Sequence, residues 1–367
     1  MKKVKQIEFT FEVVRIVVGL LVAFGITLLS IVFVSKEPLI AIKNFMIGPF
    51  ENVRNFGQLM GKYTAYILSG CGMCFIYACG RFNLSGEGIV NFAPAVPCLI
   101  LYTTNVMTNL PLLVNLTIIL VTCGITGGLV SLIPAFAREK FGASEMVMSI
   151  ILNYMLLFVS QYILKIFMVD RDISYLGTPL HPDNARFKRF FGDSNFTTAI
   201  FVAIAGWIVA SVIFDYMRVG AKIKIVGANI HFAEYAGINS VRMMYVAQFI
   251  GGIFSGLAGA VDTFGLFGRY QYIALTNIGM DGLIVAVLAK KNPKFVPLSA
   301  FVLAYIRSAA VVLNYTTEIP YEFVDIMSAV LVFFVAAQEF LSKPKNKMIF
   351  DASREREAER AKEGAKA

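Results

Sequence analysis

The sequence contains little charge. Only 16% of its 367 residues are Asp, Glu, Lys or Arg, against about a quarter in a typical soluble domain, whereas 57% are hydrophobic. A water-facing surface on a chain of this length needs more charge, so lipid must cover much of the molecule. The composition excludes an ordinary soluble protein and predicts an all-α polytopic membrane protein.

Histidine is scarce, and cysteine is not arranged for metal binding. The chain has two histidines and five cysteines. Cys71 and Cys74 form a C-x-x-C pair, but no second pair and no histidine cluster accompany it. The cysteines all lie inside or beside apolar stretches, where we expect them to be small, buried hydrophobic residues. The sequence therefore indicates neither an intramembrane enzyme nor a metal or redox site.

A phosphate loop of the form G-x-x-x-x-G-K-[ST] is absent from the sequence, so we expect no nucleotide to bind to this chain. The nearest glycine cluster comprises Gly251, Gly252, Gly256 and Gly259. These residues form a small-residue face of the kind that lets membrane helices pack closely. We predict that this cluster serves packing and that the chain holds no cofactor.

Long hydrophobic runs are the dominant feature of the sequence. A helix needs about 20 apolar residues to cross the ~30 Å hydrocarbon core of a bilayer, and about ten segments approach or exceed that length. We place these spans at 12–34, 57–79, 83–104, 112–136, 145–168, 197–215, 242–262, 276–290, 295–314 and 322–341.

The basic residues are distributed unevenly between the predicted loops. If the N-terminus is inside, the cytoplasmic loops carry most of the lysine and arginine, as the positive-inside rule requires. This asymmetry also accounts for the net charge of +9 without nucleic-acid binding. We therefore predict a cytoplasmic N-terminus at 1–11, a transmembrane domain at 12–341 and a charged cytoplasmic tail at 342–367.

A polar, glycine-bearing pattern recurs at 83–90 and 277–284. Each stretch has an asparagine, an acid four residues later, a glycine and then aliphatic residues. The two patterns occupy corresponding positions if the chain consists of two halves of five spans. An odd number of spans per half gives the halves opposite orientations, which predicts two inverted five-helix repeats.

The acids of these two stretches, Glu87 and Asp281, are costly within a membrane. An ionisable group inside a span costs roughly 2.5–3.5 kcal/mol on insertion scales, so it usually faces protein or a water-filled path. The alternative is that both acids cap helix starts, where a carboxylate favours the positive end of the helix dipole. The two interpretations are compatible, because a capped, broken helix can still line a pathway.

The predicted inside loop at 216–241 contains a short helix signal. Asn229 is a plausible N-cap, and Gly237 supplies a left-handed stop eight residues later. A helix of about two turns is not stable alone, so something must pack against it. We expect Ile230, Phe232 and Tyr235 to be exposed for a cytoplasmic partner, with contact to the membrane surface as the alternative.

Several motifs give this chain a resemblance to a known family. The segment 227–239 resembles the coupling segment of permeases from the simple-sugar and nucleoside branch of ATP-binding cassette (ABC) importers. Residues 82–89 resemble the F-N-I-G-x-E-G-Q motif of that family, and 279–293 resemble its G-F-D-G-I-A-V-A-L-L-G…N-P motif. Gly142–Glu145 with Leu152–Tyr154 resemble its G-A-N-E…L-N-Y segment. The order and spacing agree from about residue 50 to 340, and the similarity is greatest to the nucleoside type.

The chain departs from the family pattern at four positions. Ser85 stands where the family usually has glycine, and Ile89 stands where it usually has glutamine. Lys290 and Lys291 follow the eighth predicted span where glycine is usual. The loss of the glutamine weakens any inference about the identity of the substrate.

The resemblance implies a permease subunit in a bacterial cell membrane, where this chain would form the translocation pathway for a nucleoside or a simple sugar. It implies a cytoplasmic ABC ATPase, a second permease subunit (commonly a heterodimer) and an extracellular or periplasmic substrate-binding protein as partners. ATP would bind to the ATPase. From the two matching stretches and the polar groups within spans, we predict that the pathway residues are Asn83, Ser85, Glu87, Asn153, Asn277 and Asp281. The implied ATPase-coupling residues are Gly227, Asn229, Phe232, Ala233, Glu234, Tyr235, Ala236 and Gly237.

Two further sets of residues are candidates for function. Asn153, Tyr154 and Gln248 are polar groups within spans that either line the route or join helices by hydrogen bonds. The outer loop 169–196 is either a docking surface for the substrate-binding protein or an ordinary solvated loop; the candidate residues are Asp170, Arg171, Asp172, His181, Arg186, Lys188 and Arg189. An ion-coupled secondary transporter is the rival function, since it shares the inverted repeat and the buried acids but does not need a coupling segment.

Overall fold

The computed structural model describes residues 37–104, 107, 110–192 and 194–317, together with residues 25, 29, 31 and 32. Its contacts divide the chain into a large unit, Asn44–Val312, and a smaller unit formed by the two ends of the chain. The predicted spans at 322–341 and, apart from four residues, 12–34 lie outside the described residues, as do the N-terminus and the charged tail. The account below concerns the large unit.

The described part of the chain is helical, as predicted, and no strand occurs in it. Its α-helices are α2 (Pro38–Glu51), α3 (Val53–Ala78), α4 (Gly86–Phe92), α5 (Ala95–Thr103), α6 (Leu112–Phe141), α7 (Glu145–Ile163), α8 (Ala199–Tyr216), α9 (Arg218–Ala228), α10 (Ile230–Tyr235), α11 (Ser240–Val261), α12 (Ile278–Leu288) and α13 (Val296–Thr316). Two π-helices, η2 (Leu164–Met168) and η4 (Asp262–Phe267), extend α7 and α11. A short 3₁₀ turn, η3 (Asp183–Ala185), lies in a loop, and a second, η5 (Pro293–Phe295), leads directly into α13.

Five of the described helical segments are long and apolar enough to cross a membrane. They are Leu112–Phe141, Glu145–Met168, Ala199–Tyr216, Ser240–Phe267 and Pro293–Thr316. Each coincides with a span predicted from the sequence. α3 coincides with the predicted span at 57–79 and is mostly buried, because other helices surround it.

The predicted span at 83–104 is not one helix. α4 ends at Phe92 and α5 begins at Ala95. Pro94 has no N–H to donate to the carbonyl four residues earlier, so it interrupts the helical hydrogen bonds. The prediction of a continuous helix was wrong here, and two short helices take its place.

α11 packs closely against its neighbours through the glycine cluster that the sequence predicted. A Cβ atom at Gly252 would overlap the carbonyl oxygen of Gly127 on α6, and one at Gly256 would overlap the carbonyl oxygen of Cys123. Backbones approach this closely only where side chains are absent. The packing role of the cluster is confirmed, and so is the burial of all five cysteines.

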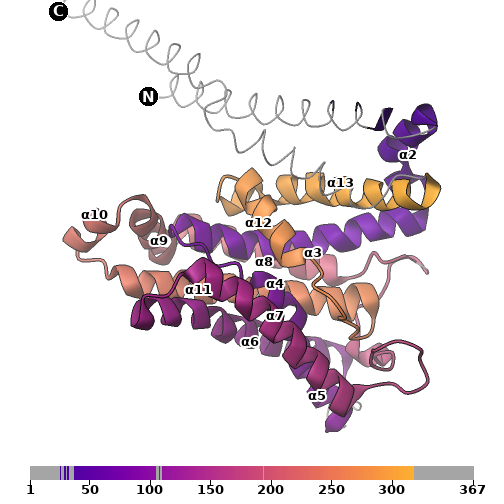
Figure 1. The fold of residues 1–367 in the computed structure, drawn as a ribbon, viewed down its shortest axis with the longest axis horizontal. Coiled ribbons are helices and arrows are strands. Elements are labelled where there is room, and N and C mark those ends of the chain that lie inside the picture. Colours follow the sequence, from indigo (N-terminus) through magenta and orange to yellow (C-terminus); the bar gives the residue numbers. More distant parts are fainter. Residues whose placement is uncertain are drawn as a thin grey trace, which may run out of the picture. The chain divides into compact units, whose positions relative to one another are not determined.

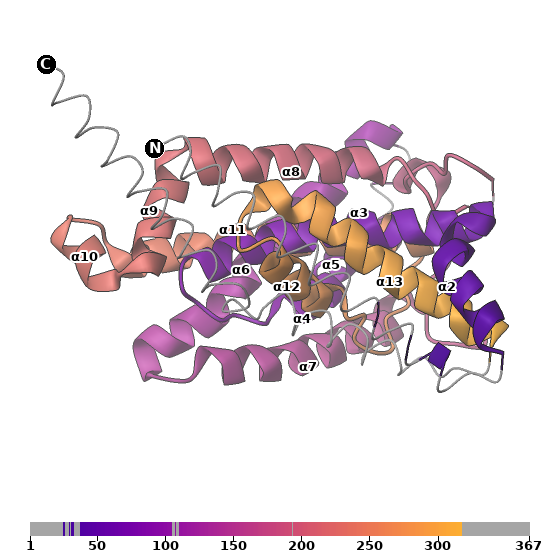
Figure 2. The ribbon, with the colours of Figure 1, turned by 90° about the horizontal axis from the view of Figure 1, so that it is seen from above.

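The large unit has one long helix along each of two opposite edges and two short helices at one end. Figure 2 shows α8 along one edge and α7 along the opposite edge, with α3, α4, α11 and α12 between them. α9 lies at one end of the unit beside the end of α3, and α10 lies beyond α9 (Figure 1). This arrangement places the short helices α4 and α12 in the interior.

Candidate functional site

The two polar stretches that the sequence singled out meet in the structure. The carboxylate of Glu87, in the first turn of α4, accepts hydrogen bonds from the backbone N–H groups before and within the first turn of α12. The donors are Asn277 (2.6 Å), Gly279 (2.7 Å) and Met280 (3.2 Å). A carboxylate at this position satisfies N–H groups that have no partner within their own helix. Glu87 therefore caps a helix, but the helix belongs to the other stretch.

The meeting of α4 and α12 depends on close backbone contact. A Cβ atom at Gly279 would overlap the backbone of Glu87, so glycine is required there. Asn277 holds a left-handed conformation (φ 63°), which asparagine tolerates better than most residues. The starts of the two helices are thus fixed against each other by backbone geometry and by one buried side chain.

α7 holds the first stretch from the other side. The Asn153 amide oxygen accepts from the N–H of Gly88 (2.8 Å), and its amide nitrogen donates to the carbonyl of Leu84 (3.0 Å). One turn earlier, the Ser149 hydroxyl accepts from the N–H of Leu84 (3.0 Å). Side chains of α7 therefore satisfy the backbone of the non-helical segment that leads into α4.

Asp281 is buried in a different environment. Arg307 of α13 donates to both of its carboxylate oxygens, at 2.8 and 3.1 Å, and the Tyr66 hydroxyl of α3 also donates to it. Asp281 and Arg307 are 2% and 6% exposed, so the ion pair is shielded from water. The sequence analysis missed Arg307, although it is the only charged residue in the predicted span 295–314, and an isolated charge of that kind is itself a signal.

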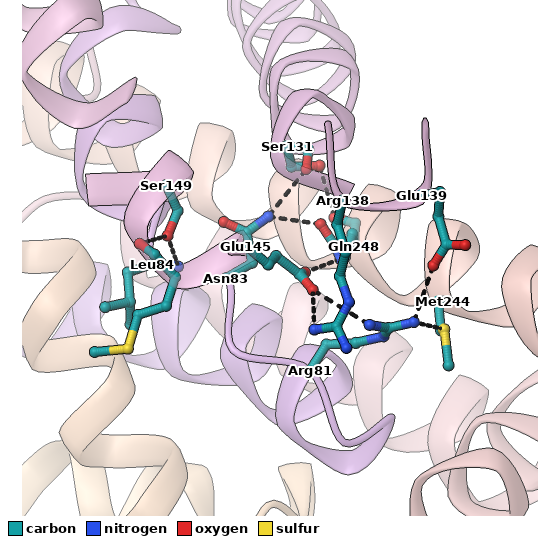
Figure 3. A network of polar contacts seen from close by, with 11 residues as sticks. Arg81, Asn83, Leu84, Ser131, Arg138, Glu139, Glu145, Ser149, Met244 and Gln248 are labelled. Carbon is teal, nitrogen blue, oxygen red and sulfur yellow. Dashed lines mark hydrogen bonds and ion pairs between the residues drawn. The ribbon is translucent and has the colours of Figure 1, made fainter. Parts of the chain in front are cut away.

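A second buried polar cluster lies where α3 leads into α4 (Figure 3). Arg81 donates to Glu139 (3.1 Å) and lies 3.7 Å from Glu145, which also pairs with Arg138 at 3.4 Å. The Gln248 amide of α11 donates to Glu145 and accepts from Asn83 (2.7 Å). Three helices (α6, α7 and α11) and the α3–α4 segment therefore share one network of charges and amides.

The structure thus brings the predicted pathway residues into one region. Asn83, Ser85, Glu87, Asn153 and Asp281 are buried, whereas Asn277 is exposed. Asn83 also accepts from the N–H of Ser85 through its side-chain oxygen (2.9 Å). Of the two other polar residues in spans, Gln248 is buried within the second cluster and Tyr154 is 52% exposed.

The predicted coupling segment forms a short projecting helix. The Asn229 side chain accepts from the N–H of Phe232 (3.0 Å), and Gly237 has a φ of 74°, so the predicted cap and stop are both confirmed. Phe232 and Tyr235 are 61% and 94% exposed, while Ala233 is buried. Gly227 packs on the end of α3, where a Cβ atom would overlap the carbonyl of Ala78.

One prediction for the outer loop, the surface position of His181, was wrong. His181 is not a surface residue: it is 2% exposed, its ring stacks on Phe264 and Tyr102 lies 2.8 Å from its Nδ1. Burial, with Arg186 and Arg269 nearby, lowers the pKa of His181 to about 3, so it is neutral at neutral pH. Tyr102 of α5 and Phe264 of η4, which are distant in the sequence, enclose the ring, and a linear sequence does not reveal such contacts.

Of the other charged residues predicted in this loop, Arg186, Lys188 and Arg189 border a cleft, whereas Asp170, Arg171 and Asp172 do not line it. It has a volume of about 720 Å³ and is lined in part by Asp183, Arg186, Lys188 and Arg189. Three of these four groups are cationic, so the cleft is predominantly basic.

Comparison with known proteins agrees with the motifs. Residues 55–336 match the family described as branched-chain amino acid transport system / permease component. The chain is 28% identical to the guanosine ABC transporter permease protein NupP of Bacillus subtilis (strain 168) over 79% of this chain and 83% of that protein. It is 25% identical to the nucleoside ABC transporter permease protein NupB of Lactococcus lactis subsp. cremoris (strain MG1363) over 89% of this chain and 93% of that protein.

A similar fold has been solved in PsaBC from Streptococcus pneumoniae in complex with Fab. The TM-score is 0.50 at 13% sequence identity, and the match covers 83% of this chain and 99% of that chain. This likeness concerns the fold alone.

These findings decide the class of the protein. The family model covers most of the chain, the relatives are permease subunits of ABC transporters, and several helices are suited to cross a membrane. Membership implies an ATPase and a substrate-binding protein as partners. The chain belongs to the branched-chain amino acid transport system / permease component family, and it is a multi-pass membrane permease subunit and not an enzyme.

Proposed function

We propose that this chain is one of two permease subunits that together enclose the translocation pathway of an ABC importer for nucleosides. The observation that carries the proposal is the meeting of α4 and α12, whose starts are joined by Glu87 in the interior of a membrane protein. Broken helices whose ends meet inside a bundle are where transporters place substrate. Simple sugars are the second candidate substrate class.

The polar groups near this junction suit a neutral, hydroxyl-bearing solute. The charge of Glu87 is satisfied by backbone N–H groups, and that of Asp281 is balanced by Arg307. The amides of Asn83 and Asn153 are bonded to neighbouring protein groups. The groups that remain to receive a solute are the Ser85 hydroxyl, which has no hydrogen-bond partner among the described residues, and the exposed amide of Asn277. A nucleoside carries no net charge and many hydrogen-bonding groups, so it matches this character.

The proposed architecture is ten spans in two inverted repeats of five. The junction of α4 and α12 supports it, because the two matching stretches approach each other near the interior of the large unit (Figure 2). The proposed orientation places both termini and the loop 216–241 in the cytoplasm of a bacterial cell. The loop 169–196 then faces outward, where its basic cleft would receive the substrate-binding protein.

Two opposite edges of the large unit differ in the side chains they expose. Apart from Tyr216 at its last position, α8 exposes aliphatic and phenylalanine side chains: Phe201, Ile204, Ile208, Val209 and Val212. α7 exposes tyrosines and methionines among its apolar residues: Met146, Tyr154, Met155, Phe158 and Tyr162. Tyrosine and methionine are enriched at protein interfaces. This contrast supports lipid contact at α8 and contact with a second, related permease at α7.

The proposed site of ATPase contact is α10. Its exposed Phe232 and Tyr235 would enter a groove on the ATPase, while Gly227, Asn229 and Gly237 hold the segment in shape. Ala233, Glu234 and Ala236 complete the proposed contact segment. ATP would bind to the ATPase, with no cofactor in this chain.

Co-purification tests this proposal. The tagged protein is isolated in mild detergent from its native host, as the wild type and as a Phe232→Arg/Tyr235→Arg variant. Both substituted side chains are exposed, so the fold should persist. A Tyr175→Arg/Phe191→Arg variant, which changes two exposed aromatic residues of the outer loop, is the matched control.

We expect an ATPase and a second permease to accompany the wild type and the control. The α10 variant should lose the ATPase and keep the second permease. If the wild type purifies alone and, in liposomes, transports solute with an ion gradient as the driving force, this proposal is wrong and the protein is a secondary transporter.

A further inference from the structure

The coupling segment is in direct contact with the turn that ends α3. Gly227 lies against the carbonyl of Ala78, and the next turn contains Gly80, which has a φ of 74°. The N–H of Arg81 donates to the carbonyl of Ile76 at 3.2 Å, which completes a Schellman turn at the end of α3. A displacement of the coupling segment therefore acts directly on the backbone next to Arg81.

The Arg81 side chain enters the buried cluster of Figure 3. It pairs with Glu139 and Glu145, and the Arg81 and Glu145 side chains are only 8% and 2% exposed. Breaking a buried pair leaves an uncompensated charge. Arg81 therefore cannot move away from Glu145 unless it finds another partner.

Glu145 begins a row of contacts between α7 and the segment 81–88. Glu145, Ser149 and Asn153 are spaced four residues apart, so they lie on one face of α7. They contact, in turn, Arg81, the N–H of Leu84, and the backbone of Leu84 and Gly88. This row ends beside Glu87, whose carboxylate holds the start of α12.

The cluster also has room to rearrange. A cleft of about 580 Å³ borders it and is lined in part by Arg81, Arg138, Glu139 and Glu145. The Arg81 Nε has no hydrogen-bond partner among the described residues. Arg81 can therefore exchange partners without crossing packed side chains.

We propose that Arg81 and Glu145 are positioning residues that transmit movement of the coupling segment to the junction of α4 and α12. This inference rests on the proposed function, since it assigns a route between the ATPase contact and the pathway. Arg81 receives the displacement through the turn at Gly80. Glu145 passes it to α7, which holds the segment leading to Glu87.

The test uses the complete transporter, with the co-purified ATPase, second permease and binding protein, reconstituted in proteoliposomes. ATP hydrolysis and uptake of radiolabelled guanosine are measured together for the wild type, Arg81→Gln, Arg81→Lys and Glu145→Gln. Arg138→Gln is the matched control, because Arg138 pairs with Glu145 but does not belong to the segment 81–88.

We expect the amount of guanosine taken up per ATP hydrolysed to fall about tenfold in Arg81→Gln and Glu145→Gln, within the range typical of coupling between sites. Arg81→Lys should restore part of the ratio, and Arg138→Gln should leave it unchanged. A merely structural role would reduce the amount of assembled transporter and leave this ratio as in the wild type.

An unchanged ratio in both Arg81→Gln and Arg81→Lys overturns the inference, and so does an equal fall in Arg138→Gln. If the transporter with Glu145→Gln does not assemble, the ratios measured for the two Arg81 variants alone test the inference. A wild-type complex that shows no ATP-dependent uptake contradicts the proposed function instead, so the two failures are distinguishable.

Discussion

The stretches 83–90 and 277–284 have matching residue patterns but stabilise their acids by different means. Glu87 is held by backbone N–H groups at the start of α12. Asp281 is held by the guanidinium of Arg307 and the hydroxyl of Tyr66. One acid therefore joins two helix starts, whereas the other forms an ion pair between neighbouring helices.

The asparagines of the two stretches differ in the same way. Asn83 has an ordinary backbone conformation, and its side chain bonds to Ser85 and Gln248. Asn277 uses its tolerance of a positive φ to turn the chain into α12. Matching residues in the two stretches thus have different structural roles. Substitutions at matching positions should therefore change stability by different amounts.

The largest effect is expected at Asp281. Asp281→Asn leaves Arg307 buried without its counter-ion, which costs about 3–5 kcal/mol of stability. Thermal unfolding in detergent measures the loss. The control is the pair Asp281→Leu/Arg307→Met, which removes both charges and should cost much less. If Asp281→Asn is as stable as the double variant, the charge of Arg307 does not depend on Asp281 for its compensation, and the account of the ion pair is contradicted.

A smaller effect is expected at the matching acid. Glu87→Gln keeps one acceptor but loses the charge that strengthens three hydrogen bonds at a helix start. We expect a loss of about 2 kcal/mol in the same thermal assay, together with loss of uptake. Glu51→Gln, at an exposed residue, is the control. Full stability in Glu87→Gln would mean that the carboxylate does not hold α12.

One glycine from each stretch provides a third comparison of stability. Gly279→Ala would press a methyl group into the backbone of Glu87, which must then shift, at a cost of about 1–3 kcal/mol. Gly86→Ala, in the first stretch, meets the end of the flexible Met73 side chain first and should be tolerated better. Equal melting temperatures for the two variants would contradict the close approach of α4 and α12.

The smallest effect is a gain of stability at the far end of α12. The N–H of Lys290 donates to Val287 and that of Lys291 to Ala286, which is a Schellman turn with Lys290 at the left-handed position (φ 53°). Glycine suits this position better. Lys290→Gly should raise the unfolding free energy by about 1 kcal/mol, while Lys222→Gly, within α9, should lower it. A lower melting temperature in Lys290→Gly would refute the assignment.

The sequence predicted the features that depend on residues close together in the chain. Hydrophobic length predicted the five described helices that are long enough to cross a membrane. The spacing of Asn229 and Gly237 predicted the cap and stop of α10, because these contacts join residues close in the chain. The approach of α11 to its neighbours was predictable as well, since a row of glycines has few other uses in a membrane helix.

The features that the sequence did not reveal are long-range contacts. Arg307 and Asp281 lie on different helices, and no local pattern connects them. The capping of a helix start by Glu87 was one of the two interpretations, but the sequence did not reveal that the helix is α12. His181 lies in a polar loop, but Tyr102 and Phe264 from distant segments enclose it. Each of these depends on which segments the fold places side by side.

The central claim is that this chain forms the pathway of an ATP-driven importer for nucleosides. Its most direct test is uptake of radiolabelled guanosine by proteoliposomes that contain the complete co-purified complex. We predict uptake that requires ATP and the substrate-binding protein and that persists when ionophores collapse all ion gradients. Uptake by this chain without ATP, driven by a proton or sodium gradient and abolished by ionophores, would contradict the account.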